Sequence, residues 1–90
     1  MNMRKERFDK IMNSDVDFSI FIKYQDNTAF LGLQIIRKYL PTRGIEDAGH
    51  EIIYSVNVDQ ILEAGITEED AVELRSLNWM IENNRLACFV

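Results

Sequence analysis

The sequence contains few of the residues that build covalent cross-links, metal sites or sharp turns. Its 90 residues include one cysteine, one histidine, one proline and four glycines. A single cysteine, Cys88, cannot form an intramolecular disulfide, and without a cluster of cysteine and histidine the sequence predicts no metal site or other cofactor. This cysteine usage favours a reducing, cytoplasmic location.

Long hydrophobic runs are also absent. No stretch approaches the roughly 18 consecutive apolar residues that a transmembrane helix requires. The basic residues near the N-terminus are not followed by the apolar segment of a signal peptide. The sequence therefore predicts no association with a membrane.

The remaining composition is that of one globular domain. Hydrophobic residues make up 47% of the chain and charged residues 28%. A chain of this length buries only about 60 to 65% of the surface that its unfolded form exposes, so association with a second copy would add useful burial. We expect residues 15–90 to form a single domain, preceded by residues 1–14 as an amphipathic helix or an arm.

Three segments have the apolar patterns of β-strands. Residues 16–24 and residues 51–58 place apolar, β-branched or aromatic side chains at every second position. Such alternation indicates strands with one buried face. Residues 86–90 are a short apolar run that predicts a third strand. Whether these strands are parallel or antiparallel stays open.

A core helix is expected between the first two strands. Residues 29–40 place Ala29, Leu33 and Ile36 on one helical face, and Pro41 ends the helix. Residues 41–49 contain the proline and two of the four glycines, and they predict the longest loop.

A helical hairpin is expected near the C-terminus. Thr67 is a favourable N-cap residue, and the three acids that follow it suit the partial positive charge at a helix N-terminus. The second helix should therefore cover residues 68–81. Gly65 can end the preceding helix, which we expect over residues 58–64.

These elements predict an α+β fold. A small sheet of about three strands would carry the core helix and the helical hairpin on one face. The expected order along the chain is α-β-α-β-α-α-β.

Charge is distributed unevenly along the chain. The net charge is −5, yet residues 1–14 carry a net +2 and residues 59–83 a net −6. Two solvated helix faces would account for this polarity, but so would an acidic surface that binds a basic partner or the basic arm of another copy. The candidate acidic partner-binding face consists of Glu68, Glu69, Asp70 and Glu73. The candidate basic arm consists of Arg4, Lys5, Arg7 and Lys10.

Nucleic-acid regulation is an alternative that the charges partly oppose. Residues 58–81 could form a helix-turn-helix whose second helix reads DNA, but phosphates would repel its acidic first turns. The basic arm could still contact nucleic acid. The acidic face would also suit an inhibitor that mimics nucleic acid.

Catalysis receives little support. A thiol nucleophile at Cys88 would need a base such as His50 and an orienting acid such as Asp26 or Glu51. Cys88 lies in an apolar run without a flanking nucleophile motif, where cysteine behaves as a small hydrophobic residue. We therefore expect that the protein is not an enzyme and that His50 lies at the surface or at a strand end.

The leading prediction is a small, soluble, non-enzymatic protein–protein interaction module. Its partner would be another protein or a second copy in a homodimer. Phe21 lies on the polar face of its strand and Met80 lies off the apolar stripe of its helix, so these residues, with Trp79, form the candidate interface. Phe30 and Phe89 are further candidates for an exposed apolar patch.

Overall fold

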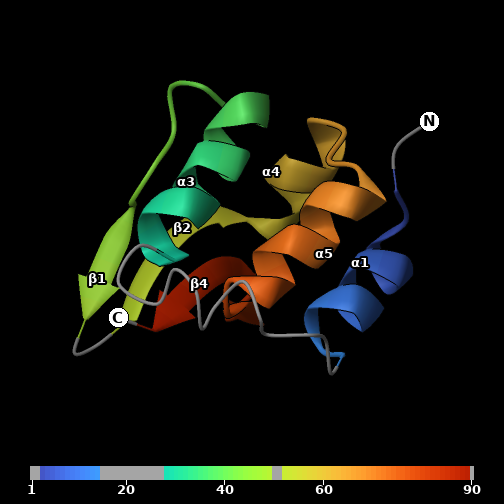
Figure 1. The fold of residues 1–90 in the computed structure, drawn as a ribbon. Helices are drawn as coiled ribbons and strands as arrows, with labels where there is room; N and C mark the ends of the chain where they lie inside the picture. The colour runs from blue at the N-terminus through green and yellow to red at the C-terminus, as the bar shows by residue number, and fades with distance from the viewer. Residues whose placement is uncertain (1–2, 15–27, 50–51, 90) are drawn as a thin grey trace.

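The computed structural model describes residues 3–14, 28–49 and 52–89, and within these ranges it contains four helices and four strands (Figure 1). The helices are α1 (Lys5–Met12), α3 (Thr28–Tyr39), α4 (Val58–Glu63) and α5 (Glu68–Ser76). The strands are β1 (Asp47–Gly49), β2 (Ile52–Asn57), β3 (Trp79–Glu82) and β4 (Arg85–Phe89). The domain is therefore α+β, as the sequence predicts.

The four strands form one antiparallel sheet in the order β1-β2-β4-β3. One row of side chains across this sheet runs through Ala48, Ile53, Cys88 and Trp79, and it lies on the side of α3. The neighbouring row runs through Asp47, Tyr54, Ala87 and Met80 on the other face. Figure 1 shows α3 and α5 lying over one face of the sheet.

All four described helices contribute to one hydrophobic core. α1 packs against α5 and buries Phe8, Ile11 and Met12. The apolar spacing at i, i+3 and i+4 therefore marks the side of α1 that faces the core. The remaining members of the cluster are Ile36, Val56, Val58, Ile61, Leu62, Ile66, Ala71, Leu74, Leu77, Trp79, Leu86 and Cys88.

Local capping signals fix where α4 and α5 begin. The side chain of Asn57 accepts a hydrogen bond of 2.9 Å from Gln60 N, and the side chain of Gln60 accepts one of 3.1 Å from Asn57 N. This reciprocal capping box starts α4 directly at the end of β2. Thr67 Oγ1 accepts from Asp70 N at 3.2 Å, as expected for the N-cap of α5.

The end of α5 differs from the sequence prediction. A helix was expected over residues 68–81, but α5 ends at Ser76. Asn78 adopts a φ of 66°, in the left-handed region where asparagine is among the more tolerant residues. The chain then enters β3, in which Trp79 is buried. The apolar residues from position 79 onward, which the sequence assigns to the end of the helix, therefore belong to a strand.

The sheet has four strands in the described ranges rather than about three. β1 lies within the segment that the sequence predicts as a loop, and β3 lies within the segment predicted as a helix. β2 and β4 confirm the predicted strands over residues 51–58 and 86–90 to within one residue. The strand predicted over residues 16–24 lies outside the described residues.

α3 approaches the sheet closely at a glycine. Gly32 is buried in the middle of α3, and a β-carbon built on it would overlap the indole ring of Trp79. The indole N–H donates a hydrogen bond of 3.1 Å to the backbone oxygen of Thr28, at the start of the same helix. Glycine costs about 1 kcal/mol relative to alanine inside a helix, so the indole ring supplies the reason for its presence here.

Replacing Gly32 with alanine should destabilise the domain. The added methyl group would force the indole ring or α3 to move, and overpacking a core typically costs about 1 to 3 kcal/mol. We expect Gly32→Ala to lower the free energy of unfolding by about 2 kcal/mol in urea denaturation, despite the better helix propensity of alanine.

Gly44→Ala is the matched control, because no atom lies within 4 Å of the position of its β-carbon. This substitution should change the free energy of unfolding by less than about 0.5 kcal/mol. Equal effects at the two positions would contradict a tight contact between α3 and Trp79.

Candidate functional site

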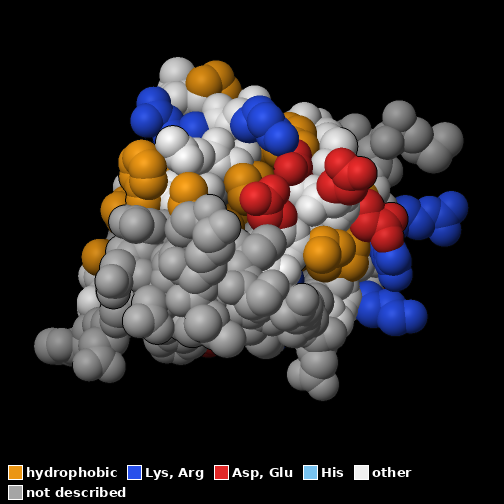
Figure 2. Space-filling model, in the orientation of Figure 1, with side chains coloured by type: hydrophobic (Ala, Val, Ile, Leu, Met, Phe, Trp, Pro, Cys, Tyr) orange, Lys and Arg blue, Asp and Glu red, His pale blue; other side chains and the backbone are white. Residues whose placement is uncertain are grey.

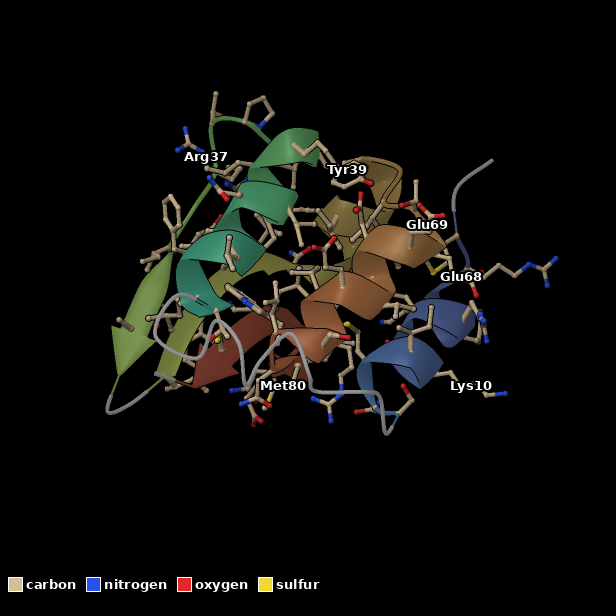
Figure 3. The ribbon with its side chains drawn as sticks, in the orientation of Figure 1. Lys10, Arg37, Tyr39, Glu68, Glu69 and Met80 are labelled. Atoms are coloured by element: carbon tan, nitrogen blue, oxygen red, sulfur yellow. The ribbon has the colours of Figure 1, made fainter. Side chains whose placement is uncertain are left out.

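A polar cluster joins the end of α3 to the start of α5. Tyr39 extends from α3 toward α5 (Figure 3) and donates its hydroxyl proton to Asp70. The same hydroxyl accepts from Thr67 N at 3.2 Å. Lys38 Nζ lies 2.5 Å from Asp70 Oδ2. The residues that cap α5 therefore also hold it against α3.

Asp70 is held in its charged form by this cluster. Burial alone would raise the pKa of its carboxyl group, but hydrogen bonds to Lys38, Tyr39 and Thr67 and the charge of Lys38 lower the pKa below its ordinary value. The pKa of Lys38 is raised, chiefly by its hydrogen bond to Asp70. Asp70 is only 8% exposed, so its carboxylate binds Lys38 and Tyr39 and offers little surface to a partner.

The other three acids of the predicted acidic face are solvent-accessible on α5, and Glu73 also lines the groove between α5 and α3. Glu68, Glu69 and Glu73 are exposed, and Val72 lies among them with 41% of its surface exposed. Figure 2 shows acidic side chains gathered over this helix. Glu68 pairs with Arg7 of α1, whereas neither Glu69 nor Glu73 forms an ion pair within the described part of the chain. We call Glu69, Val72 and Glu73 the acidic α5 face.

The residues predicted as a basic arm lie at α1. Lys5, Arg7 and Lys10 are exposed on this helix, and Arg4 is its N-cap residue. Figure 3 shows Lys10 extending away from the molecule. These bases therefore belong to the outer side of a packed helix, and the ion pair with Glu68 uses one of them.

Of the three residues predicted as an interface, the two that the structure describes, Trp79 and Met80, lie on opposite faces of the sheet. Trp79 is completely buried beneath α3, because its indole fills the space above Gly32. It therefore offers no side-chain surface to a partner. Met80 is half-buried in β3, on the sheet face away from α3 (Figure 3). Phe21 lies outside the described residues.

Along the chain, α4 is followed by a short turn, α5 and the β3–β4 hairpin, which is the order of elements that the helix-turn-helix alternative requires. The turn contains Gly65, whose φ of 90° strongly favours glycine. In a DNA reader built this way, the second helix would present its outer side to the major groove. Here that side carries the acidic α5 face, which phosphates would repel.

A groove with exposed hydrophobic residues lies between α3 and the segment that follows it. Phe30 is 60% exposed and Ile45 is 56% exposed, and both line this groove of about 410 Å³ together with Leu33. Arg37 and Arg43 also line it. Figure 2 shows hydrophobic and basic side chains close together on this side of the molecule. We call this feature the Phe30–Ile45 groove.

The two arginines of the groove differ in their partners. Arg43 Nε donates to Glu46 Oε2 at 2.7 Å, so its charge is compensated. Arg37 donates from Nε and Nη2 to the carbonyl oxygen of Pro41 at 3.2 and 3.0 Å. No carboxylate in the described ranges pairs with Arg37, which therefore gives the groove a net positive charge.

Sequence reasoning identified only part of this groove. The sequence marks Phe30 as a candidate for an exposed apolar patch, whereas Ile45 lies in the predicted loop and belongs to no apolar pattern. The available signal was an isoleucine between Gly44 and Glu46, where a large apolar residue has no helical or strand pattern to bury it.

A second groove of about 410 Å³ separates α3 from α5. Leu31, Ile35 and Leu77 line its apolar part. Lys38, Asp70 and Glu73 line its polar part; Lys38 and Asp70 pair with each other, and the charge of Glu73 also acts on Lys38. This groove therefore carries one more negative than positive charge, in contrast to the Phe30–Ile45 groove, which is lined by two arginines.

The described residues contain neither a cluster of metal-ligating side chains nor a helix that is long and apolar enough to span a membrane. Cys88 is completely buried, and burial raises the pKa of its thiol, although a hydrogen bond with Thr28 acts in the opposite direction. A buried thiol with a raised pKa is a poor nucleophile. The base and acids considered as its partners, His50, Asp26 and Glu51, lie outside the described ranges.

Comparison with known proteins adds no family assignment. No family model matches the chain, no curated protein matches its sequence and no solved structure matches its fold.

Replacing Asp70 with asparagine should weaken the connection between α3 and α5. The variant keeps one acceptor oxygen but loses the negative charge that strengthens the hydrogen bonds with Lys38 and Tyr39. One hydrogen bond to a charged group typically contributes about 1.5 to 3 kcal/mol, and solvent screens the share of the exposed Lys38. Since folding lowers the pKa of Asp70, this contribution is fully present above the unfolded pKa near 4 and is lost as the pH falls through the folded pKa. Urea denaturation should give a difference of about 2 kcal/mol between the two proteins at neutral pH, shrinking toward pH 2.

Glu69→Gln is the matched control, because it removes the same charge from an exposed neighbouring position. We expect it to change the free energy of unfolding by less than about 0.5 kcal/mol. A deficit of Asp70→Asn that stays constant as the pH falls would argue against a stabilising charge at this position.

Proposed function

We propose that this protein is a non-enzymatic module that binds another polypeptide through the Phe30–Ile45 groove. The exposure of Phe30 and Ile45 on the same groove is the observation that carries this proposal. Contiguous exposed apolar residues with a polar rim are typical of protein interaction sites. A partner that covered them would recover the apolar burial that a chain of this size lacks.

The composition of the groove suits a protein ligand. Aromatic residues and arginine are enriched at protein interfaces, and an aromatic side chain at the centre often contributes most of the binding energy. Phe30 is such an anchor, with Ile45 beside it and Arg37 at the rim. The volume of about 410 Å³ accommodates a few side chains of a partner rather than a whole element.

The proposal that the protein is not an enzyme is based on the environments of its thiol and of the two arginines in the groove. The thiol of Cys88 is enclosed in the core. Of the charged groups at the groove, Arg43 pairs with Glu46, and Arg37 holds the carbonyl oxygen of Pro41. These groups fix the loop after α3, and none of them forms the nucleophile and base pair that covalent catalysis requires. A cytoplasmic location is part of the proposal.

Binding to nucleic acid is the second candidate. The succession of α4, a short turn and α5 favours it, and the exposed bases of α1 could contact phosphates. The acidic α5 face opposes it, because the helix that would enter the major groove carries negative charge. An inhibitor that mimics nucleic acid would use this same acidic face.

A photo-crosslinking residue at position 30 should capture a partner in native cells. Benzoylphenylalanine in place of Phe30 keeps an aromatic ring in the groove, and we expect a discrete adduct by gel electrophoresis and mass spectrometry. A second substitution, Ile45→Asp, should reduce its yield at least fivefold, because a carboxylate would then occupy the apolar centre of the groove.

Benzoylphenylalanine at Lys5 is the control, since this exposed position on α1 is not part of the groove. It should give no adduct of the same mass. If position 30 yielded nothing beyond this control, or an adduct that Ile45→Asp leaves unchanged, the Phe30–Ile45 groove would not be the binding site.

A gel-shift experiment separates the two candidates. We expect no shift of duplex DNA at low salt, where phosphate contacts are strongest, because the outer side of α5 is acidic. A salt-sensitive shift that disappears on changing Lys5 and Lys10 to glutamine would favour nucleic-acid binding through α1 instead.

A further inference from the structure

The Phe30–Ile45 groove selects for an occupant with two properties. Its centre is apolar and exposed, so the occupant must insert a hydrophobic side chain. Its rim carries the positive charge of Arg37, for which no carboxylate partner exists in the described ranges. The occupant should therefore place an acidic residue next to its hydrophobic one.

The acidic α5 face has this combination. In the described part of the chain, three large hydrophobic side chains are exposed: Phe30, Ile45 and Val72. The first two lie in the groove, and the third lies on α5 with Glu69 three residues before it and Glu73 directly after it. On a helix these spacings place Glu69 beside both of the other residues. Neither acid forms an ion pair within the described ranges, although Glu73 lines the same groove as Lys38 and its charge contributes to the raised pKa of that amine.

We infer that the occupant of the Phe30–Ile45 groove is the acidic α5 face of a second copy of this chain. In this contact, Val72 of one copy packs between Phe30 and Ile45 of the next, and its flanking glutamates lie close to Arg37. The inference rests on the proposed function and names the partner of the same groove.

The two surfaces share no residue: the Phe30–Ile45 groove lies along α3 and the segment after it, whereas the acidic α5 face lies on α5. Phe30, Leu33 and Arg37 line the Phe30–Ile45 groove, whereas Leu31 and Ile35 line the groove that faces α5. Figure 1 likewise shows the segment after α3 on the side away from α5. One copy can therefore use both surfaces at once.

A contact between two different surfaces is heterologous. Repeating it joins copies head to tail, and the assembly either closes into a ring or continues as a chain. We therefore expect assemblies larger than a dimer as the concentration rises, and their formation should weaken with added salt because charges on opposite copies attract.

Two substitutions each remove one side of the contact. Ile45→Asp disrupts the groove and leaves the acidic α5 face intact, and Val72→Asp does the reverse. Both positions are exposed, so both variants should fold, as circular dichroism can verify. In sedimentation velocity, each variant alone should associate at least tenfold more weakly than the wild type.

Mixing the two variants provides the decisive measurement. An equimolar mixture pairs an intact groove with an intact acidic α5 face, so it should form dimers that cannot grow further. Lys10→Asp adds acid at an exposed position of α1 and serves as the control, with association constants within twofold of the wild type.

A wild type that stays monomeric at every concentration would overturn the inference, as would a dimer that Ile45→Asp or Val72→Asp leaves intact. A mixture without dimers would also overturn it. If the protein is monomeric but the position 30 crosslink captures a different polypeptide in an Ile45-dependent way, the proposed function stands and only the second copy is excluded. Failure of both experiments would remove the proposed function as well.

Discussion

The contact between Gly32 of α3 and the indole ring of Trp79 sets the distance between the helix layer and the sheet. Glycine leaves room for the ring, and the oxygen of Thr28 receives its N–H. On the sheet side, Cys88 of β4 lies directly opposite Trp79 in the register. Because α3 is held at this point, its remaining sides face the two grooves. The surface that we assign to binding therefore depends on a contact buried beneath it.

Features that depend on neighbours in sequence were predictable. Thr67 and Gly65 mark the hairpin because capping and left-handed backbone geometry are local. The end of α5 was not predictable, since the leucine spacing suits a helix through residue 81 and the chain turns into β3 instead. The chain leaves the helix at this point so that Trp79 can pack against Gly32 of α3. This contact joins segments far apart in the sequence, so a local apolar pattern does not reveal it.

The same distinction holds for the candidate site. Exposure of Glu69 and Glu73 followed from their charge and their place on a helix. Asp70 belongs to the same sequence pattern, yet Lys38 and Tyr39 of α3 draw it into the molecule. The groove was only half visible in the sequence, because the position of Ile45 beside Phe30 depends on the path of the chain after α3. Pairings between distant segments decided each of these cases.

The buried Trp79 also provides an intrinsic fluorescence probe of the domain. Trp79 is the single tryptophan of the chain, so all indole emission comes from the junction between α3 and the sheet. An enclosed indole emits at shorter wavelength than a hydrated one, and neighbouring groups govern its quantum yield. Separation of α3 from β3 would therefore change the emission spectrum even if the rest of the fold stayed intact. Fluorescence can thus follow this one junction without any added label.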